Sequence, residues 1–192
     1  DATREDAVHR LRARKHREAK PLALMVAQLA DAERLAVVTP AAAELLTSPE
    51  CPIVLLPRRE GSGLAPSGAP GLPEIGVMLA ATPLHHLLLM DFGRPLIMTS
   101  GNRSEDPIAI SNAEARLALG EIADGFLMHD REIVARYDDS VVRMSEPGPI
   151  VIRRARGYAP LPVDLPVPTP VPLVAVGPHL KNTLTLAHGA TA

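Results

Sequence analysis

The sequence is poor in cysteine and in aromatic residues. Its 192 residues include one cysteine, Cys51, two Phe, two Tyr and no Trp. A single cysteine excludes a disulfide framework or a cysteine-based zinc site within the chain, and favours an intracellular protein, for which we expect a cytoplasmic location. Four aromatic side chains offer few surfaces for stacking on unpaired bases, which argues against RNA as the main ligand.

Long hydrophobic runs and strong net charge are also missing. The longest apolar stretches are about half of the roughly 20 residues that a membrane helix needs, so we predict no membrane association. A net charge of -2 does not favour a surface built wholly for nucleic acid. Neither GxxxxGK[ST] nor GxGxxG occurs. Because the chain begins at Asp1 without a basic and apolar leader, we interpret it as a fragment.

Proline, in contrast, is abundant and concentrated near the C-terminus. Six of the 20 prolines lie in residues 160–172, where fixed φ angles and missing N–H donors favour a stiff, extended linker. We therefore predict one domain over residues 1–159, a linker over 160–172, and the truncated start of a further domain over 173–192. That last part is interpreted as a strand, a turn and a second strand.

Before the prolines, strand and helix signals alternate. Thr3 with Asp6 favours a cap for a first helix that ends near Arg14, Thr39 with Pro40 a helix start, and Ser111 with Glu114 a capping box. A further helix is expected over residues 84–91. The pattern predicts an α/β domain with a twisted, open mixed β-sheet and flanking helices. Its expected strands are residues 22–27, 36–39, 52–57, 75–80, 96–100, 125–129, 140–144 and 150–155.

A basic run precedes the first of these strands. Six cations fall within eleven residues: Arg10, Arg12, Arg14, Lys15, Arg17 and Lys20. A solvated helix face is the plain alternative. However, the run ends against a buried strand, and ligands of open α/β sheets commonly bind at strand edges, so we expect Lys15, Arg17 and Lys20 to face a triphosphate or pyrophosphate.

A second segment, MTSGNRSEDP at residues 98–107, ends a strand in small polar residues. Ser100 and Asn102 offer a hydroxyl and an amide, and Gly101 allows close approach of backbone N–H groups to a phosphate. An ordinary turn is the alternative interpretation.

The region after residue 137 combines acids and arginines. Asp139, beside Asp138, is a weak candidate for Mg²⁺, because adjacent strand residues point to opposite faces and one of them can instead pair with arginine. Arg143 and Arg153 supply guanidinium groups suited to phosphate or carboxylate.

The tandem histidines give no metal prediction. His85 and His86 on a helix splay by about 100°, so both cannot readily hold one ion, and at most one of them, His85, is a ligand contact. No Ser-His-Asp set or reactive cysteine setting is present, and we predict no covalent or general-base residue.

Several strings in order resemble one family. RARKHREAKPLALMV, ATPLHHLLL, TSGNRSEDPI, IADGFLMHDREI, DDSVVR and IRRARGYAPLPV are similar to the YrdC-like domain of HypF carbamoyltransferases, and GPHLKNTLTLAHG is similar to the start of the domain that follows it there. The family's opening strand is absent from this sequence, so we expect the fragment to bind ATP with or without turnover.

The resemblance implies a function. In that family the YrdC-like domain joins carbamate to ATP, giving carbamoyl-adenylate and pyrophosphate, and a later domain passes the carbamoyl group to a HypE-type partner during [NiFe]-hydrogenase maturation. ATP and Mg²⁺ are the implied cofactors, with other domains of the polypeptide as further partners. By motif match, the implied ATP or carbamoyl-adenylate contacts are Lys15, Arg17, Lys20, Ser100, Asn102, Ser140, Arg143 and Arg153.

Three alternatives stay open. YrdC-like relatives act in tRNA modification, so double-stranded RNA binding through the basic run is one. A docking role without chemistry is another. The third is a natural-product O-carbamoyltransferase, which shares both domain types in a different order.

Overall fold

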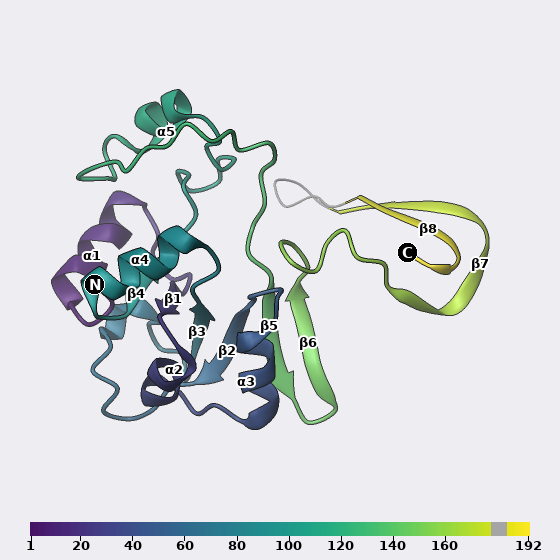
Figure 1. Cartoon of the computed structure of the whole chain (residues 1–192), viewed down its shortest axis with the longest axis horizontal. Helices are drawn as coiled ribbons and strands as arrows, with labels where there is room; N and C mark the ends of the chain where they lie inside the picture. Colours follow the sequence, from purple (N-terminus) through teal and green to yellow (C-terminus); the bar gives the residue numbers. More distant parts are fainter. Residues whose placement is uncertain (178–183) are drawn as a thin grey trace.

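The core of the molecule is a six-stranded mixed sheet in the order β4-β1-β3-β2-β5-β6 (Figure 1). A computed structural model describes residues 1–177 and 184–192. β1 pairs in parallel with β3 and β2 with β5, and the other neighbours are antiparallel. The strands are β1 (Ala23–Val26), β2 (Ile53–Pro57), β3 (Glu74–Leu79), β4 (Leu96–Met98), β5 (Val141–Ser145) and β6 (Gly148–Arg153).

Both faces of the sheet carry apolar side chains, because successive strand residues point to opposite sides. Val26, Val54 and Val77 belong to one buried cluster, together with Ala32 of α2 (Leu29–Leu35) and Leu46 of α3 (Pro40–Thr47). A second cluster joins Met25, Ile53 and Met78 to Leu89 of α4 (Pro83–Phe92). The expected α/β fold, a mixed sheet with flanking helices, is confirmed.

A third cluster places α1 (Glu5–Arg14) beside the sheet. Val8 of α1 packs with Leu22 and with Ala65, which precedes the short 3-10 helix η1 (Pro66–Gly68). The expected cap at Thr3 is wrong: the helix is preceded by Arg4 without a side-chain cap, and the Thr3 hydroxyl donates to Asp1 instead, at 2.7 Å.

The other predicted helix starts are observed. Thr39 caps α3 ahead of Pro40, and Ser111 caps α5 (Asn112–Leu119) by accepting from the Glu114 N–H. The Glu114 carboxylate accepts from the N–H of Ile110 at 3.0 Å rather than from that of Ser111, which shifts the capping box by one residue.

Two predicted strands are wrong. In residues 36–39 only Ala36 makes a bridge, to Arg58, because α2 with its Gln28–Asp31 capping box precedes this stretch and leaves it as a connection to α3. Residues 125–129 form no strand; Phe126 and Leu127 are exposed, and no neighbouring strand pairs with them among the described residues.

The proline-rich stretch does not stay unpaired. β7 (Asp164–Val176) runs through most of the expected linker at 160–172 and pairs with β8 (Leu184–Thr191), forming a hairpin that extends away from the sheet (Figure 1). The register shifts where prolines, lacking N–H groups, interrupt the ladder. The expected turn lies in 178–183, outside the described residues. The proposed division into domains stays a prediction.

Candidate functional site

The site begins where α1 ends. Lys15 caps the helix, His16 takes a left-handed backbone conformation (φ 48°), and the Arg17 N–H donates back to the Arg12 carbonyl at 3.0 Å. This reversal turns the chain toward β1. The Lys15 side chain is buried, with 5% of its surface exposed, and its Nζ donates to the Ser100 carbonyl at 2.7 Å.

A turn after β4 meets this loop, so two of the predicted segments come together. The Ser100 hydroxyl donates to Asn102 Oδ1 at 2.6 Å, and Asn102 Nδ2 donates to the Asp106 carbonyl at 2.7 Å. Ser104 Oγ donates to the Lys15 carbonyl at 2.5 Å. Burial lowers the pKa of Lys15 to about 8, with a smaller effect from Arg17. A bound anion would therefore stabilise the charged form of this side chain.

A third segment, around the start of β5 and the end of β6, supplies further cations. Arg153 Nε donates to the Asp139 carbonyl at 2.7 Å. The pKa of Arg17 is lowered by burial first, then by the charges of Arg12 and Arg153. Arg153 therefore interacts electrostatically with the α1–β1 loop. Lys15, Arg17 and Arg153 thus form one cationic region, which we call the cationic band.

Ser140 has a different setting from the one expected. It is fully buried, its hydroxyl accepts from the Ala155 N–H at 2.8 Å, and it donates to the Arg156 carbonyl at 2.9 Å. With donor and acceptor both used, Ser140 ties the start of β5 to the chain after β6.

The remaining predicted residues lie less centrally. Arg143 is ion-paired with Glu74 on the neighbouring part of the sheet at 2.7 Å, and Lys20 has an exposed side chain. His85 accepts from the Ala81 N–H through Nδ1, and burial lowers its pKa, partly opposed by Asp139.

Asp139 is held by an arginine. Its Oδ1 accepts from Arg156 Nε and from the second guanidinium nitrogen at 3.0 and 2.9 Å. Within residues 1–177 and 184–192, no group of three or more His, Cys, Asp or Glu side chains is arranged to hold a metal ion. With Oδ1 paired to Arg156, Asp139 does not fit the expected role of a Mg²⁺ ligand.

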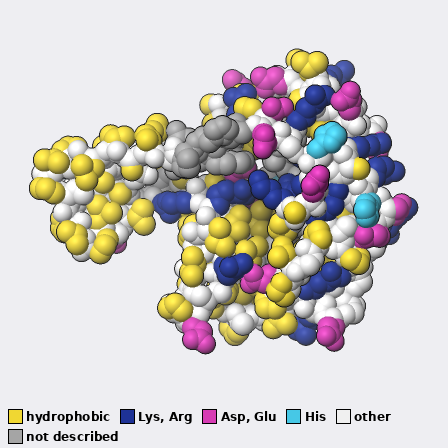
Figure 2. Space-filling view, turned by 180° about the vertical axis from the view of Figure 1, so that it is seen from behind, with side chains coloured by type: hydrophobic (Ala, Val, Ile, Leu, Met, Phe, Trp, Pro, Cys, Tyr) yellow, Lys and Arg dark blue, Asp and Glu magenta, His cyan; other side chains and the backbone are white. Residues whose placement is uncertain are grey.

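One face of the molecule shows how the charge is distributed. In Figure 2, Lys and Arg side chains form a row across the middle of this face, above an area of hydrophobic side chains. Such a surface suits a ligand with an anionic part and an apolar part.

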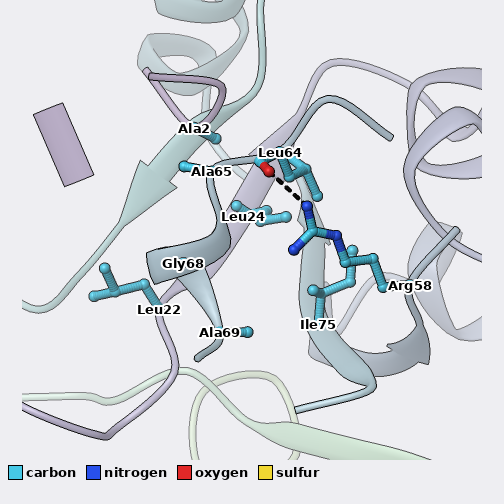
Figure 3. A pocket seen from close by; sticks show the side chains of 9 residues that line it. All are labelled: Ala2, Leu22, Leu24, Arg58, Leu64, Ala65, Gly68, Ala69 and Ile75. Carbon is cyan, nitrogen blue, oxygen red and sulfur yellow. Dashed lines mark hydrogen bonds between the residues drawn. The ribbon is translucent and has the colours of Figure 1, made fainter. Parts of the chain in front are cut away.

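The small cavity in Figure 3 is a separate feature. Arg58 donates to the Leu64 carbonyl at 2.5 Å beside it, and no predicted site residue lines it. Its lining is largely apolar: Ala2, Leu22, Leu24, Arg58, Leu64, Ala65, Gly68, Ala69 and Ile75. We assign it to packing.

Sequence reasoning missed two side chains that shape the site. Ser104, in the middle of a predicted motif, was not selected although it bonds the Lys15 loop. Arg12 was named only as one cation of the basic run and was not selected, yet it is 7% exposed. The signal was its spacing, four residues after Val8, which places both on the buried face of α1.

Comparison with known proteins identifies the family of this chain. Residues 1–155 match the Sua5–YciO–YrdC family model, described as telomere recombination. Carbamoyltransferase HypF of Rhodobacter capsulatus is 53% identical over 188 residues, covering 97% of this chain and 25% of that protein. The full-length HypF crystal structure, in its phosphate- and nucleotide-bound form, is 42% identical with a TM-score of 0.92, covering 100% of this chain and 25% of that one.

A more distant structure is the Sua5 protein of P. abyssi complexed with L-threonine, with a TM-score of 0.68 and 26% identity over 81% of this chain and 46% of that one. The chain spans about a quarter of the length of the HypF relatives that it matches. No helix among the described residues has the length and apolarity of a membrane span. The resemblance to HypF carbamoyltransferases is confirmed, and the chain belongs to the Sua5–YciO–YrdC family as a HypF-type member.

Proposed function

We propose that this chain binds ATP and joins it to carbamate, forming carbamoyl-adenylate within a HypF-type carbamoyltransferase. The observation that carries the proposal is the buried Lys15 ammonium, held against the Ser100–Asn102 turn beside Arg17 and Arg153. The match to a HypF structure in a phosphate- and nucleotide-bound form supports a nucleotide as a ligand of this type of protein.

The reaction needs charge stabilisation more than proton transfer. A carbamate oxygen attacks the α-phosphorus of ATP, a new P–O bond forms, and the bond to the β-phosphate oxygen breaks with pyrophosphate leaving. Carbamate is already an anion, so no general base is required. The obstacle is to hold anions together and stabilise the leaving group, which fixed cations do in a partly buried site.

Individual roles follow from position. Lys15, Arg17 and Arg153 neutralise the phosphates, and Ser100 and Asn102 bind carbamate or the adenylate after exchanging their mutual hydrogen bond for the ligand. Lys20, whose side chain is exposed, is a cation at the edge of the site. Arg143 contacts the ligand only after its ion pair with Glu74 breaks. His85 contacts the ligand near Asp139. Ser140 contributes by holding the two chain segments, rather than by touching ligand.

Mg²⁺ enters with the nucleotide in this proposal. Asp139 Oδ1 is paired with Arg156, so phosphate oxygens and water, rather than this carboxylate, would supply the coordination of the ion. The wider function follows the family: the product passes to other domains of the same polypeptide and on to a HypE-type partner in [NiFe]-hydrogenase maturation, in the cytoplasm.

Carbamate-dependent ATP–pyrophosphate exchange tests the reaction. The chain is incubated with ATP, labelled pyrophosphate and a bicarbonate–ammonium mixture that supplies carbamate, beside a longer chain that begins upstream. Label should enter ATP only when both carbamate precursors are present, and Asn102→Ala should reduce the rate. Exchange in neither chain, with ATP bound, would contradict adenylate formation.

A further inference from the structure

One buried arginine organises the loop that carries the cations. Arg12 lies in the last turn of α1 with 7% of its surface exposed. Its guanidinium has five N–H donors, and each finds a backbone carbonyl. The five acceptors are the carbonyls of Arg17, Glu18, Lys20, Ser67 and Gly68.

These bonds link two segments that are distant in sequence. Three acceptors belong to the α1–β1 loop and two to η1. The Arg12 carbonyl also accepts from the Arg17 N–H at 3.0 Å, so the loop is held from both its donor and its acceptor sides. The loop therefore wraps around one guanidinium, and its shape depends on that planar group.

Charge gives Arg12 a second effect. None of the ion pairs found among the described residues includes it; its direct partners are neutral carbonyls, with Glu5 acting only at longer range. Its positive charge lowers the pKa of Arg17, so the two guanidinium groups interact. A positive charge buried without a carboxylate adds to the attraction of this region for an anion.

We propose that Arg12 is a positioning residue for the nucleotide site: it fixes the α1–β1 loop so that Lys15 and Arg17 meet the phosphates. It touches no ligand itself. This inference rests on the proposed ATP binding and deepens it, because it assigns the shape of the cationic band to one side chain outside that band.

Arg12→Lys is the decisive variant, since it keeps the charge but has three donors on a flexible stem and cannot bond five carbonyls in two segments. Arg59→Lys is the matched control. Arg59 also donates to backbone carbonyls, those of Glu33 and Ala36, but it anchors α2 and not the α1–β1 loop. Each variant of the full chain is titrated with ATP well below its Tm.

Hydrogen–deuterium exchange of the nucleotide-free chain gives a readout that does not depend on ATP. Amides of residues 16–20 should exchange faster in Arg12→Lys than in the wild type, while those of β2 and β3 keep their protection. ATP affinity should fall on the order of tenfold or more, because the loop no longer holds Lys15 and Arg17 in place for the phosphates, and Arg59→Lys should bind like the wild type.

The outcomes separate the two proposals. Unchanged affinity in Arg12→Lys, or equal losses in both variants that follow their Tm, overturns the positioning role. If the wild type itself binds no ATP, the proposed function fails, and the exchange measurement alone decides whether Arg12 shapes the loop: unchanged exchange of residues 16–20 overturns that too.

Discussion

The six-stranded sheet and the β7–β8 hairpin are both rich in apolar residues, yet they use them differently. In the sheet, Val54 and Val77 are completely buried under α2 and α3. In the hairpin, Val174 and Leu186 are 70% and 66% exposed. An apolar segment can pair as a strand while remaining exposed, because its burial requires a second layer to cover it.

The site follows the same division. Every residue of the cationic band belongs to the part of the chain that forms the six-stranded sheet and its helices: Lys15 and Arg17 follow α1, and Arg153 ends β6. Rigid, covered elements hold side chains more accurately than exposed ones do. The buried clusters and the proposed site residues thus belong to the sheet and its flanking helices, so we expect the hairpin to contribute less to stability and to nucleotide binding.

The largest expected effect comes from opening the core. Leu46→Ala removes a side chain buried between α3 and the sheet and should lower the free energy of unfolding by about 2–5 kcal/mol. Leu186→Ala, the same change in the hairpin, should cost less than about 0.5 kcal/mol. Urea unfolding followed by circular dichroism measures both free energies. Similar losses would contradict the difference in burial between the sheet and the hairpin.

Ser140 comes next. Ser140→Ala leaves the partly buried Ala155 N–H without its acceptor and removes the buried Ser140 hydroxyl from its bond to the Arg156 carbonyl, which should cost about 1–3 kcal/mol of unfolding free energy. Ser145→Ala, at the other end of β5, removes one bond to the Gly148 carbonyl and should cost about 1 kcal/mol or less. A Ser140→Ala chain of wild-type stability with weak ATP binding would mean that Ser140 contacts the ligand instead.

The smallest effect is a pH dependence. Burial lowers the pKa of Lys15 to about 8, and its protonated form binds phosphate, so the Lys15 contribution to ATP affinity should be nearly constant up to pH 7 and already be falling at pH 8. Above it, affinity should fall by up to about tenfold per pH unit, since bound phosphates raise the pKa of Lys15 in the complex.

Lys15→Arg is the control for this profile, because a guanidinium remains charged over the whole range. Its affinity, whatever its absolute value, should not change between pH 7 and 9. Titration calorimetry at constant ionic strength provides the measurement. A wild-type profile that stays flat to pH 9 would show that Lys15 does not titrate next to the nucleotide.

Much of the fold was predictable because local signals agreed with the final packing. Thr39–Pro40 and Ser111 begin helices as expected, and strands near 22–27, 52–57 and 75–80 are present. The strand predicted at residues 36–39 was wrong because a short apolar run does not distinguish a strand from a connection between helices. The two strands after residue 172 were expected and are present, but the extension of β7 back through the prolines was not, because proline content does not encode pairing partners.

The candidate site was predictable only in part. Lys15, Ser100 and Asn102 carry recognisable motifs, and the structure brings them into contact. Arg12 and Asp139 could not be assigned in the same way. The spacing after Val8 indicates that Arg12 is buried, but two of its five partners, the carbonyls of Ser67 and Gly68, are 55 and 56 residues away. Asp139 likewise pairs with an arginine 17 residues further along the chain.

Calorimetric titration of ATP into the wild-type chain and into Lys15→Met at pH 7 tests the central claim most directly. A methionine keeps much of the length of the buried side chain and removes its charge. The account predicts saturable binding by the wild type, and a loss of about 10- to 100-fold in the variant, as expected for a charged hydrogen bond worth about 1.5–3 kcal/mol. A folded Lys15→Met chain that binds ATP as tightly as the wild type would contradict it.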